Sequence, residues 1–206
     1  MSTARPVTTT SAAAVAGRGV ALAAARPDDR ILVIGAGTIG LLAAAKARQR
    51  NGEVTIVARH DHQAEAASQL GIDSVSERDV HDWARESRPN IVIETVGGTT
   101  GDSLALGIRL VARGGRIVVL GTFLTIEIEM LRTSLKEVTI VPSFAYGHTD
   151  GRDDFREAAA SLVDIGDRAG VLVSHRFPLE AVAAAFDAAA DKSTGAIKVA
   201  VLGSTS

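Results

Sequence analysis

The sequence predicts a doubly wound α/β fold built on a six-stranded parallel sheet, and three observations lead to this prediction. Short runs rich in Val and Ile recur between residues 30 and 142, with helical stretches between them. Each run is apolar at consecutive positions, which is typical of strands that are covered on both faces. The first run, ILVIGAGTIG at 31–40, leads directly into a glycine-rich turn and a helix. This alternation predicts the strand order 3-2-1-4-5-6.

Six strands and four crossover helices are expected in this region. The strands are expected at 31–34, 54–57, 72–75, 91–94, 117–120 and 138–141. The helices are expected at 39–50, 63–70, 77–86 and 101–112. Three of these helices are followed closely by glycine, which is a common signal for the end of a helix.

Three parts of the chain are expected. Residues 1–27 should form a flexible tip and an Ala-rich helix at about 11–25, and residues 28–145 the doubly wound unit. Residues 146–206 should form an appendage with helices at 154–165 and 179–190, a short strand at 171–175 and a closing strand within 195–202. Asp150, Asp153 and Asp154 are interpreted as a solvated helix start, where carboxylates are favourable.

Composition excludes several classes of function. The net charge of −2 over 206 residues gives no electrostatic reason to expect nucleic acid or an acidic membrane surface as a partner. The absence of cysteine removes disulfides, Cys-ligated zinc and a thiol nucleophile. No apolar run approaches the roughly 20 residues of a membrane span. The Ala-rich start could be read as a targeting peptide; because Arg18 and two glycines interrupt it, a cytoplasmic protein is expected instead.

The glycine-rich turn GAGTIG, residues 35–40, carries the clearest chemical signal. It is a GxGxxG pattern between a strand and a helix. Gly35 would allow the tight turn, Gly37 the close approach of a pyrophosphate, and Gly40 close packing of helix on strand. The helix beginning at Thr38 and Ile39 would point its free N–H groups at the phosphates. The pattern therefore predicts a dinucleotide site.

The end of the second strand predicts which dinucleotide is preferred. NAD sites usually have an acid there, which bonds the ribose 2′-hydroxyl. This chain has Ala58, Arg59 and His60 at that place. An arginine binds a 2′-phosphate in a charge-assisted fork, so NADP(H) is predicted over NAD(H). The alternatives are that Arg59 is a solvated charge and that Asp61 is the acid. His60 and His62 lack a third ligand, so no metal site and no zinc are predicted.

The chain resembles the coenzyme-binding half of the medium-chain dehydrogenase/reductase family, the zinc-type alcohol dehydrogenases and their relatives. The segments that carry the resemblance are VIGAGTIGLLAA, IVIETVGG, GGRIVVLGTF, LKEVTIVPSFAYG and FPLEAVAAAFDAAADKSTGAIKV. They extend over residues 30–202. The resemblance implies a Rossmann fold that binds a nicotinamide cofactor.

The resemblance also implies roles for individual residues. Residues 95–97 would lie near the adenine ribose and residues 120–122 would face the nicotinamide. The backbone of 142–144 would bond the carboxamide. The implied cofactor residues beyond the second strand are Thr95, Val96, Gly97, Leu120, Gly121, Thr122, Pro142, Ser143 and Phe144.

One expected part of the family is missing from the sequence. Members carry an N-terminal barrel-like domain that supplies the zinc ligands, the proton relay and most of the substrate pocket. Here residues 8–26 resemble only the helix that joins the two domains, and 146–202 would lose neighbours and expose an apolar edge. The resemblance implies a homodimer through the 125–136 region. It also implies a separate substrate or catalytic domain as a partner.

The resemblance implies an NADP-dependent oxidoreductase, but this chain alone is expected to be inactive. Hydride transfer needs the nicotinamide, a substrate held beside it and a proton donor. The catalytic residues are not identified; Tyr146 and His148 are weak candidates for the general acid, beside Ser143. Two functions remain at this point: an oxidoreductase acting on an alcohol or carbonyl, or on an enone or quinone, and a non-catalytic NADP(H)-binding module that acts as a sensor or oligomer partner.

Overall fold

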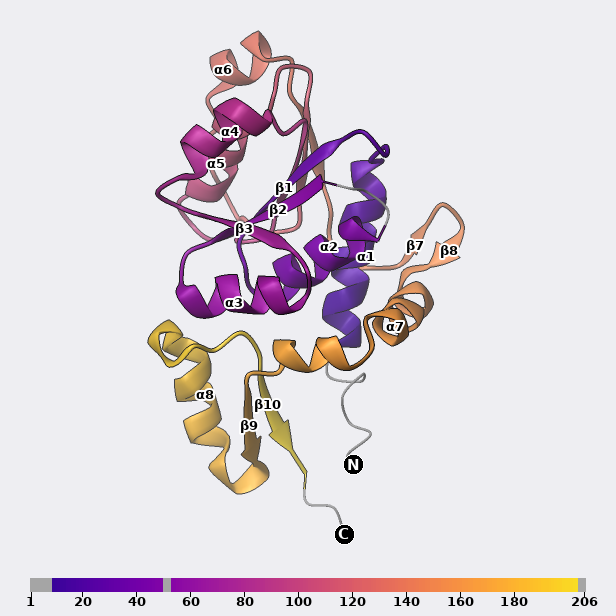
Figure 1. Ribbon diagram of the computed structural model, residues 1–206, viewed down its shortest axis with the longest axis vertical. Coiled ribbons are helices and arrows are strands. Elements are labelled where there is room, and N and C mark those ends of the chain that lie inside the picture. Colours follow the sequence, from indigo (N-terminus) through magenta and orange to yellow (C-terminus); the bar gives the residue numbers. More distant parts are fainter. Residues whose placement is uncertain (1–8, 50–52, 204–206) are drawn as a thin grey trace.

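The structure is a computed structural model that describes residues 9–49 and 53–203. The predicted flexible tip, and the last residue of the helix predicted at 39–50, lie outside these residues. The described chain forms the predicted doubly wound unit followed by a smaller C-terminal lobe (Figure 1).

The six-stranded parallel sheet is confirmed, with the order β3-β2-β1-β4-β5-β6. Each strand lies within one or two residues of its predicted position. The strands are β1 Arg30–Ile34, β2 Glu53–Ala58, β3 Asp73–Ser76, β4 Ile91–Glu94, β5 Arg116–Val119 and β6 Thr139–Pro142. The central strand β1 pairs with both β2 and β4, so the chain reverses its direction of travel across the sheet between these two neighbours.

Helices cover both faces of the sheet, which explains the continuous apolar runs. Along β1, Ile31 and Val33 contribute to one hydrophobic cluster, whereas Leu32 and Ile34 contribute to the other. Successive side chains of a strand point to opposite faces, so each face receives its own apolar set. The helices on the first face are α1 Thr10–Ala23, α2 Thr38–Arg48, α3 Asp61–Gln69 and α7 Asp154–Ile165; those on the second are α4 Val80–Ser87 and α5 Asp102–Leu110.

The crossover from β5 to β6 contains a helix that the sequence did not predict. This helix, α6 Met130–Leu135, has only six residues. Its apolar residues Met130, Leu131 and Leu135 are all exposed. A helix that buries almost no apolar face has no amphipathic pattern, and this explains why the sequence did not reveal it.

The C-terminal lobe begins with a small hairpin and ends with a second, two-stranded parallel sheet. The hairpin strands are β7 His148–Thr149 and β8 Arg152–Asp153, and α7 follows directly. The helices predicted at 154–165 and 179–190 are confirmed as α7 and as the 3-10 turn η2 Leu179–Ala181 with α8 Val182–Ala190. Strand β9 His175–Pro178 pairs with β10 Val199–Leu202, and a short 3-10 turn, η3 Lys192–Thr194, precedes β10.

Two expectations about this lobe are wrong. Of the strand predicted at 171–175, residues 171–172 end a 3-10 helix, η1 Gly166–Leu172, residues 173–174 belong to no helix or strand, and β9 begins only at His175. Leu172 is fully buried in the cluster beneath the main sheet, so the apolar run anchors the lobe instead of forming a strand. Asp154 is not solvated; it is buried and paired with Arg18, whereas Asp153 caps α7 as expected by accepting hydrogen bonds from two backbone N–H groups.

Replacing the anchor residue should weaken the whole fold. Leu172→Ala is expected to lower the free energy of unfolding by about 2–5 kcal/mol, because it leaves a cavity among residues that pack beneath the main sheet. Urea unfolding followed by circular dichroism measures this change. Val163→Ala, at an exposed site on α7, is the control and should change the value by about 0.5 kcal/mol or less. Equal effects of the two substitutions would contradict the anchoring role.

Candidate dinucleotide-binding site

The turn between β1 and α2 is held by a very close approach of helix and strand. A Cβ atom at Gly40 would overlap the carbonyl oxygen of Gly35. Gly35 itself has a φ of 101°, which side chains rarely allow. The hydroxyl of Thr95, at the end of β4, lies 2.9 Å from the carbonyl oxygen of Ile34 and 3.0 Å from that of Gly35. Two of the predicted glycines are thus required by geometry, and Thr95 fixes the turn from the neighbouring strand.

The third glycine of the turn has a different role. Nothing lies within 4 Å of a Cβ atom built on Gly37, so the space in front of the N-terminus of α2 is open. Unpaired N–H groups at a helix N-terminus attract anions. The hydroxyl of Thr38 donates to the carbonyl oxygen of Ile197 at 3.0 Å, and so the first turn of α2 is also bonded to the C-terminal lobe. Ile39 packs partly buried against the first hydrophobic cluster.

A buried carboxylate organises the end of β4. Glu94 is fully buried, and its Oε1 accepts hydrogen bonds from the N–H groups of Val96 at 2.7 Å and Gly97 at 2.9 Å, and from the hydroxyl of Ser103 at 2.8 Å. Its Oε2 is buried and has no hydrogen-bond partner. Sequence reasoning missed this residue, although a charged residue at the end of an apolar strand was the available signal.

The ends of β4 and β5 are in direct contact. The N–H of Gly98 donates to the carbonyl oxygen of Thr122 at 3.0 Å, and a Cβ atom at Gly121 would overlap the backbone N of Gly97. Leu120 is buried against Gly19 of α1, where no room remains for a larger residue. The structure therefore brings residues 95–97 and 120–122 together at one edge of the sheet.

The loop after β6 reaches the same edge. The N–H of Ser143 donates to the carbonyl oxygen of Val119 at 2.8 Å, which ties the loop to the end of β5. The hydroxyl oxygen of Ser143 is buried and has no hydrogen-bond partner. Pro142 is the last residue of β6, and Phe144 is 83% exposed.

The end of β2 presents Arg59 to solvent. Ala58 is buried as the last residue of the strand, and the side chain of Arg59 is 70% exposed. Its Nε lies 3.4 Å from a carboxylate oxygen of Glu77. The side-chain oxygen of Gln63 accepts from the N–H groups of Arg59 and His60, so the backbone here is fixed. A recess of about 550 Å³ opens beside them, lined by Arg59, Ser76, Glu77, Arg78 and Asp79.

The weak catalytic candidates lie in the segment that follows β6. The ring of Tyr146 packs on that of Phe155 with 5.7 Å between ring centroids. His148 is exposed in β7, and its carbonyl oxygen accepts a hydrogen bond from Arg18. Within the described residues, neither side chain is hydrogen-bonded to a residue of the predicted cofactor site, and the catalytic role of both stays a prediction.

Zinc ligation finds no support among the residues that the structure describes. No group of three or more His, Asp or Glu side chains within 9–49 and 53–203 is arranged to hold a metal ion. The rings of His60 and His62 stack on each other with 5.4 Å between centroids. Within the described part of the chain, the His, Asp and Glu side chains therefore do not form a set that fits a zinc ion.

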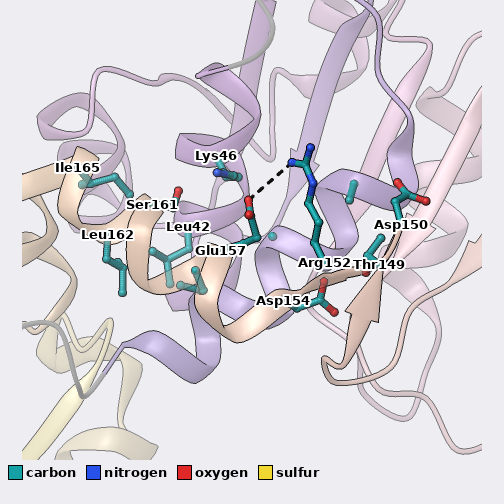
Figure 2. A pocket seen from close by; sticks show the side chains of 14 residues that line it. Leu42, Lys46, Thr149, Asp150, Arg152, Asp154, Glu157, Ser161, Leu162 and Ile165 are labelled. Carbon is teal, nitrogen blue, oxygen red and sulfur yellow. Dashed lines mark ion pairs between the residues drawn. The ribbon is translucent and has the colours of Figure 1, made fainter.

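A second cavity, of about 430 Å³, lies between α1, α2, α7 and the β7–β8 hairpin (Figure 2). Leu42 and Leu162 line its apolar part, and an ion pair between Arg152 and Glu157, 4.0 Å apart, lies at its polar side. None of the predicted cofactor residues lines it. This cavity is therefore separate from the edge where β1, β4, β5 and β6 end.

Comparison with known proteins assigns the family. The model of the zinc-binding dehydrogenase family matches residues 38–164, which is more than half of the chain. The chain belongs to the zinc-binding dehydrogenase family. Among curated relatives, L-arabinitol 4-dehydrogenase from Aureobasidium melanogenum is 32% identical over 201 residues, covering 91% of this chain and 53% of that protein. The resemblance to zinc-type medium-chain dehydrogenases is thereby confirmed.

Three solved structures share the fold of this chain. L-idonate 5-dehydrogenase from Escherichia coli K-12 superposes with a TM-score of 0.82 at 21% identity, covering 96% of this chain and 56% of that one. A protein described as a short chain alcohol dehydrogenase, from Escherichia coli CFT073 and complexed with NADH, gives a TM-score of 0.79 at 20% identity, covering 92% of this chain and 57% of that one. A zinc-binding dehydrogenase from Sinorhizobium meliloti 1021 bound to NADP gives 0.76 at 23%, covering 94% and 58%.

The matched proteins are longer than this chain and differ in the dinucleotide that they bind. The chain spans about half the length of the curated relatives and solved structures that it matches. The two cofactor-bound neighbours contain different dinucleotides, NADH in one and NADP in the other. Family membership thus supports a nicotinamide dinucleotide and leaves the choice between the two to the residues of this chain. Within the described residues, no helix has both the length and the apolar character to cross a membrane.

Filling the open space at Gly37 should block the dinucleotide without disturbing the fold. Gly37→Val is expected to weaken NADPH and NADH binding at least about tenfold, because its side chain would occupy the space that a pyrophosphate needs. Isothermal titration calorimetry measures both affinities, and thermal unfolding checks the fold. The matched control is Gly17→Val, which also faces open space, but on α1. Unchanged cofactor affinity in Gly37→Val would remove this turn from the site.

Proposed function

We propose that this chain is the NADP(H)-binding domain of a medium-chain oxidoreductase that transfers hydride between the cofactor and an alcohol or carbonyl compound, or an enone or quinone. The observation that carries the proposal is the open space in front of Gly37 at the N-terminus of α2. It lies at the turn between β1 and α2, where a doubly wound sheet binds dinucleotides. The name of the arabinitol-oxidising relative favours the alcohol and carbonyl branch.

The residues of this chain would bind and orient the cofactor. The turn 35–40 would hold the pyrophosphate on main-chain N–H groups at the positive end of α2. Residues 95–97 would lie along the adenine ribose, residues 120–122 beside the nicotinamide, and the backbone of 142–144 at its carboxamide. When bound, the cofactor supplies or accepts the hydride, and the protein contributes position and electrostatics.

Turnover would require a second component. Hydride transfer needs a held substrate and a proton donor besides the cofactor. This chain corresponds to about half of its relatives. We therefore propose that a substrate domain, in a longer protein or in a separate polypeptide, completes the enzyme. A cytoplasmic location also remains a prediction.

NADP(H) preference rests on Arg59 and the recess beside it. A 2′-phosphate there would compete with Glu77 for the guanidinium, because both are anions and the existing ion pair is exposed and therefore weak. A phosphate monoester also carries more negative charge than one carboxylate. Arg78 lines the same recess and adds a second positive charge. Exchange of Glu77 for the phosphate is thus favourable.

Reversing the charge at Arg59 tests the cofactor preference. Arg59→Asp is expected to weaken NADPH binding by about tenfold to a hundredfold and to spare NADH, because a charge-assisted contact contributes about 1.5–3 kcal/mol. Parallel titrations with the two cofactors, followed by ligand fluorescence, measure the effect. Glu77→Gln is the matched second variant and should strengthen NADPH binding, since it removes the competing carboxylate. If neither variant changes NADPH affinity, Arg59 is a solvated surface charge.

A homodimer through residues 125–136 is also proposed. Strand β6 is the last in the sheet order, and Leu124, Met130, Leu131 and Leu135 expose apolar surface in the segment before it. An edge strand beside exposed apolar side chains favours pairing with a second copy.

Placing a charge in this apolar segment should separate the copies. Leu131→Glu is expected to convert a dimer into a monomer, because it would bury a carboxylate in the interface. Size-exclusion chromatography with light scattering reports the mass. Leu179→Glu, on an exposed apolar residue of the C-terminal lobe, is the control and should leave the dimer intact. A chain that is monomeric before any substitution would refute the dimer.

The alternative is a module that binds NADP(H) without chemistry, as a sensor or oligomer partner. The packing of Tyr146 on Phe155 favours it, because a side chain used in packing is less free to act as a general acid. Oxidation of NADPH by the purified chain with a simple carbonyl or quinone would exclude this alternative. Turnover only after a substrate domain is added would support the oxidoreductase.

A further inference from the structure

A partly buried ion pair joins α1 to the segment that follows β6. Nη1 of Arg18 lies 3.2 Å from Oδ2 of Asp154, and it also donates to the hydroxyl of Thr149 at 3.1 Å and to the carbonyl oxygen of His148 at 3.2 Å. The side chain of Asp154 is 6% exposed. Figure 1 shows α1 beside β7, β8 and α7, and Figure 2 shows Asp154 and Thr149 close together at the base of the hairpin. One guanidinium thus contacts three residues of this segment.

The same carboxylate fixes Gly147. Its Oδ2 accepts the N–H of Gly147 at 2.8 Å, and the N–H of Asp154 donates back to the carbonyl oxygen of Gly147 at 3.0 Å. Burial raises the pKa of Asp154, but hydrogen bonds from Gly147, Thr149 and Arg18, together with the charge of Arg18, outweigh it and hold the pKa below its usual value. The group is therefore an anion at neutral pH, and the Arg18–Asp154 pair is ionic.

Residues 143–147 are consequently anchored at both ends. Ser143 bonds to the end of β5, and Gly147 bonds to Asp154. Between the anchors, Phe144 is exposed and Ala145 has a φ of 52°, a conformation that a non-glycine residue adopts only under constraint. Tyr146, in the same stretch, packs on Phe155. The rest of the stretch gains little from burial, so its two anchors and this ring contact determine its position.

We propose that Arg18 and Asp154 are positioning residues that hold the carboxamide loop, residues 142–147, and thereby set the affinity for the nicotinamide end of the cofactor. This inference rests on the proposed function of the loop. The pair acts through Gly147. Among the described residues its hydrogen bonds reach His148, Thr149 and Gly147 and do not reach the β1–α2 turn or Arg59, so the adenine end of the site is expected to change little. Removing Arg18 would leave the buried carboxylate of Asp154 without its positively charged partner. This is unfavourable enough to rearrange the loop.

Two ligands that differ only at the nicotinamide test the proposal. The full 206-residue chain is titrated with NADPH and with 2′-phospho-ADP-ribose, which has the same adenine end and no nicotinamide. Arg18→Met, which keeps much of the side-chain volume, is expected to weaken NADPH binding about tenfold and to change 2′-phospho-ADP-ribose binding less than twofold. Arg18→Lys should recover part of the loss, since it restores the charge.

The control is an arginine of the same hairpin. Arg152 is 68% exposed and lies 4.0 Å from Glu157, away from Gly147. Arg152→Met should leave both affinities unchanged. Asp154→Asn is the second variant if Arg18→Met does not fold; it keeps an acceptor for Gly147 and removes the charge, and it should shift the ratio of the two affinities in the same direction.

Hydrogen exchange of the ligand-free chain distinguishes a failure of the positioning proposal from a failure of the proposed function. Faster exchange of the Gly147 amide in Arg18→Met, with the β1–α2 turn unchanged, supports the proposal. Equal weakening of both ligands would show a merely structural pair and overturn it. If the unmodified chain binds neither ligand, the proposed function fails. If exchange at Gly147 is unchanged in Arg18→Met, the positioning role is overturned as well.

Discussion

The close approach of α2 to β1 is the constraint on which the rest of the site depends. Gly40 lies against the carbonyl oxygen of Gly35, and no Cβ atom fits between them. This contact places the helix N-terminus directly over the carboxyl end of the sheet. The hydroxyl of Thr95, at the end of β4, donates to the carbonyl oxygens of Ile34 and Gly35. The turn is therefore fixed by the neighbouring strand as well as by its own glycines. These contacts hold the backbone on either side of Gly37, in front of which the space is open.

Glu94 performs a similar task one strand further along. A carboxylate without access to water must find donors close by, and here two backbone N–H groups and one hydroxyl supply them. The turn that leaves β4 is therefore shaped around this buried acidic side chain, and the end of β5 packs on this turn. The polar framework beneath the predicted ribose and nicotinamide positions is thus built by side chains that stay inside the protein.

Secondary structure and turns could be predicted well from the sequence, whereas side-chain contacts between residues far apart in the chain could not. The strands, their order and the turn 35–40 follow from apolar runs and glycine spacing, which are local properties. The Arg18–Asp154 pair joins residues that are 136 positions apart, and no periodicity reports such a contact. The same limit explains the strand wrongly expected at 171–175, because only the fold reveals that Leu172 packs beneath the main sheet. The partner of Arg59, Glu77, follows another strand and was equally hidden.

The bond between Thr38 and Ile197 has a consequence for how this position can vary in evolution. A threonine has a single hydroxyl proton, and here it is given to a carbonyl oxygen of the C-terminal lobe. Toward an anionic phosphate this side chain then offers only lone pairs, and recognition falls to the main-chain amides of the turn. Selection at position 38 would therefore preserve the seating of the lobe, whereas selection at its neighbour Gly37 would preserve the ligand. Two adjacent positions in one motif would in this way be under selection for unrelated reasons.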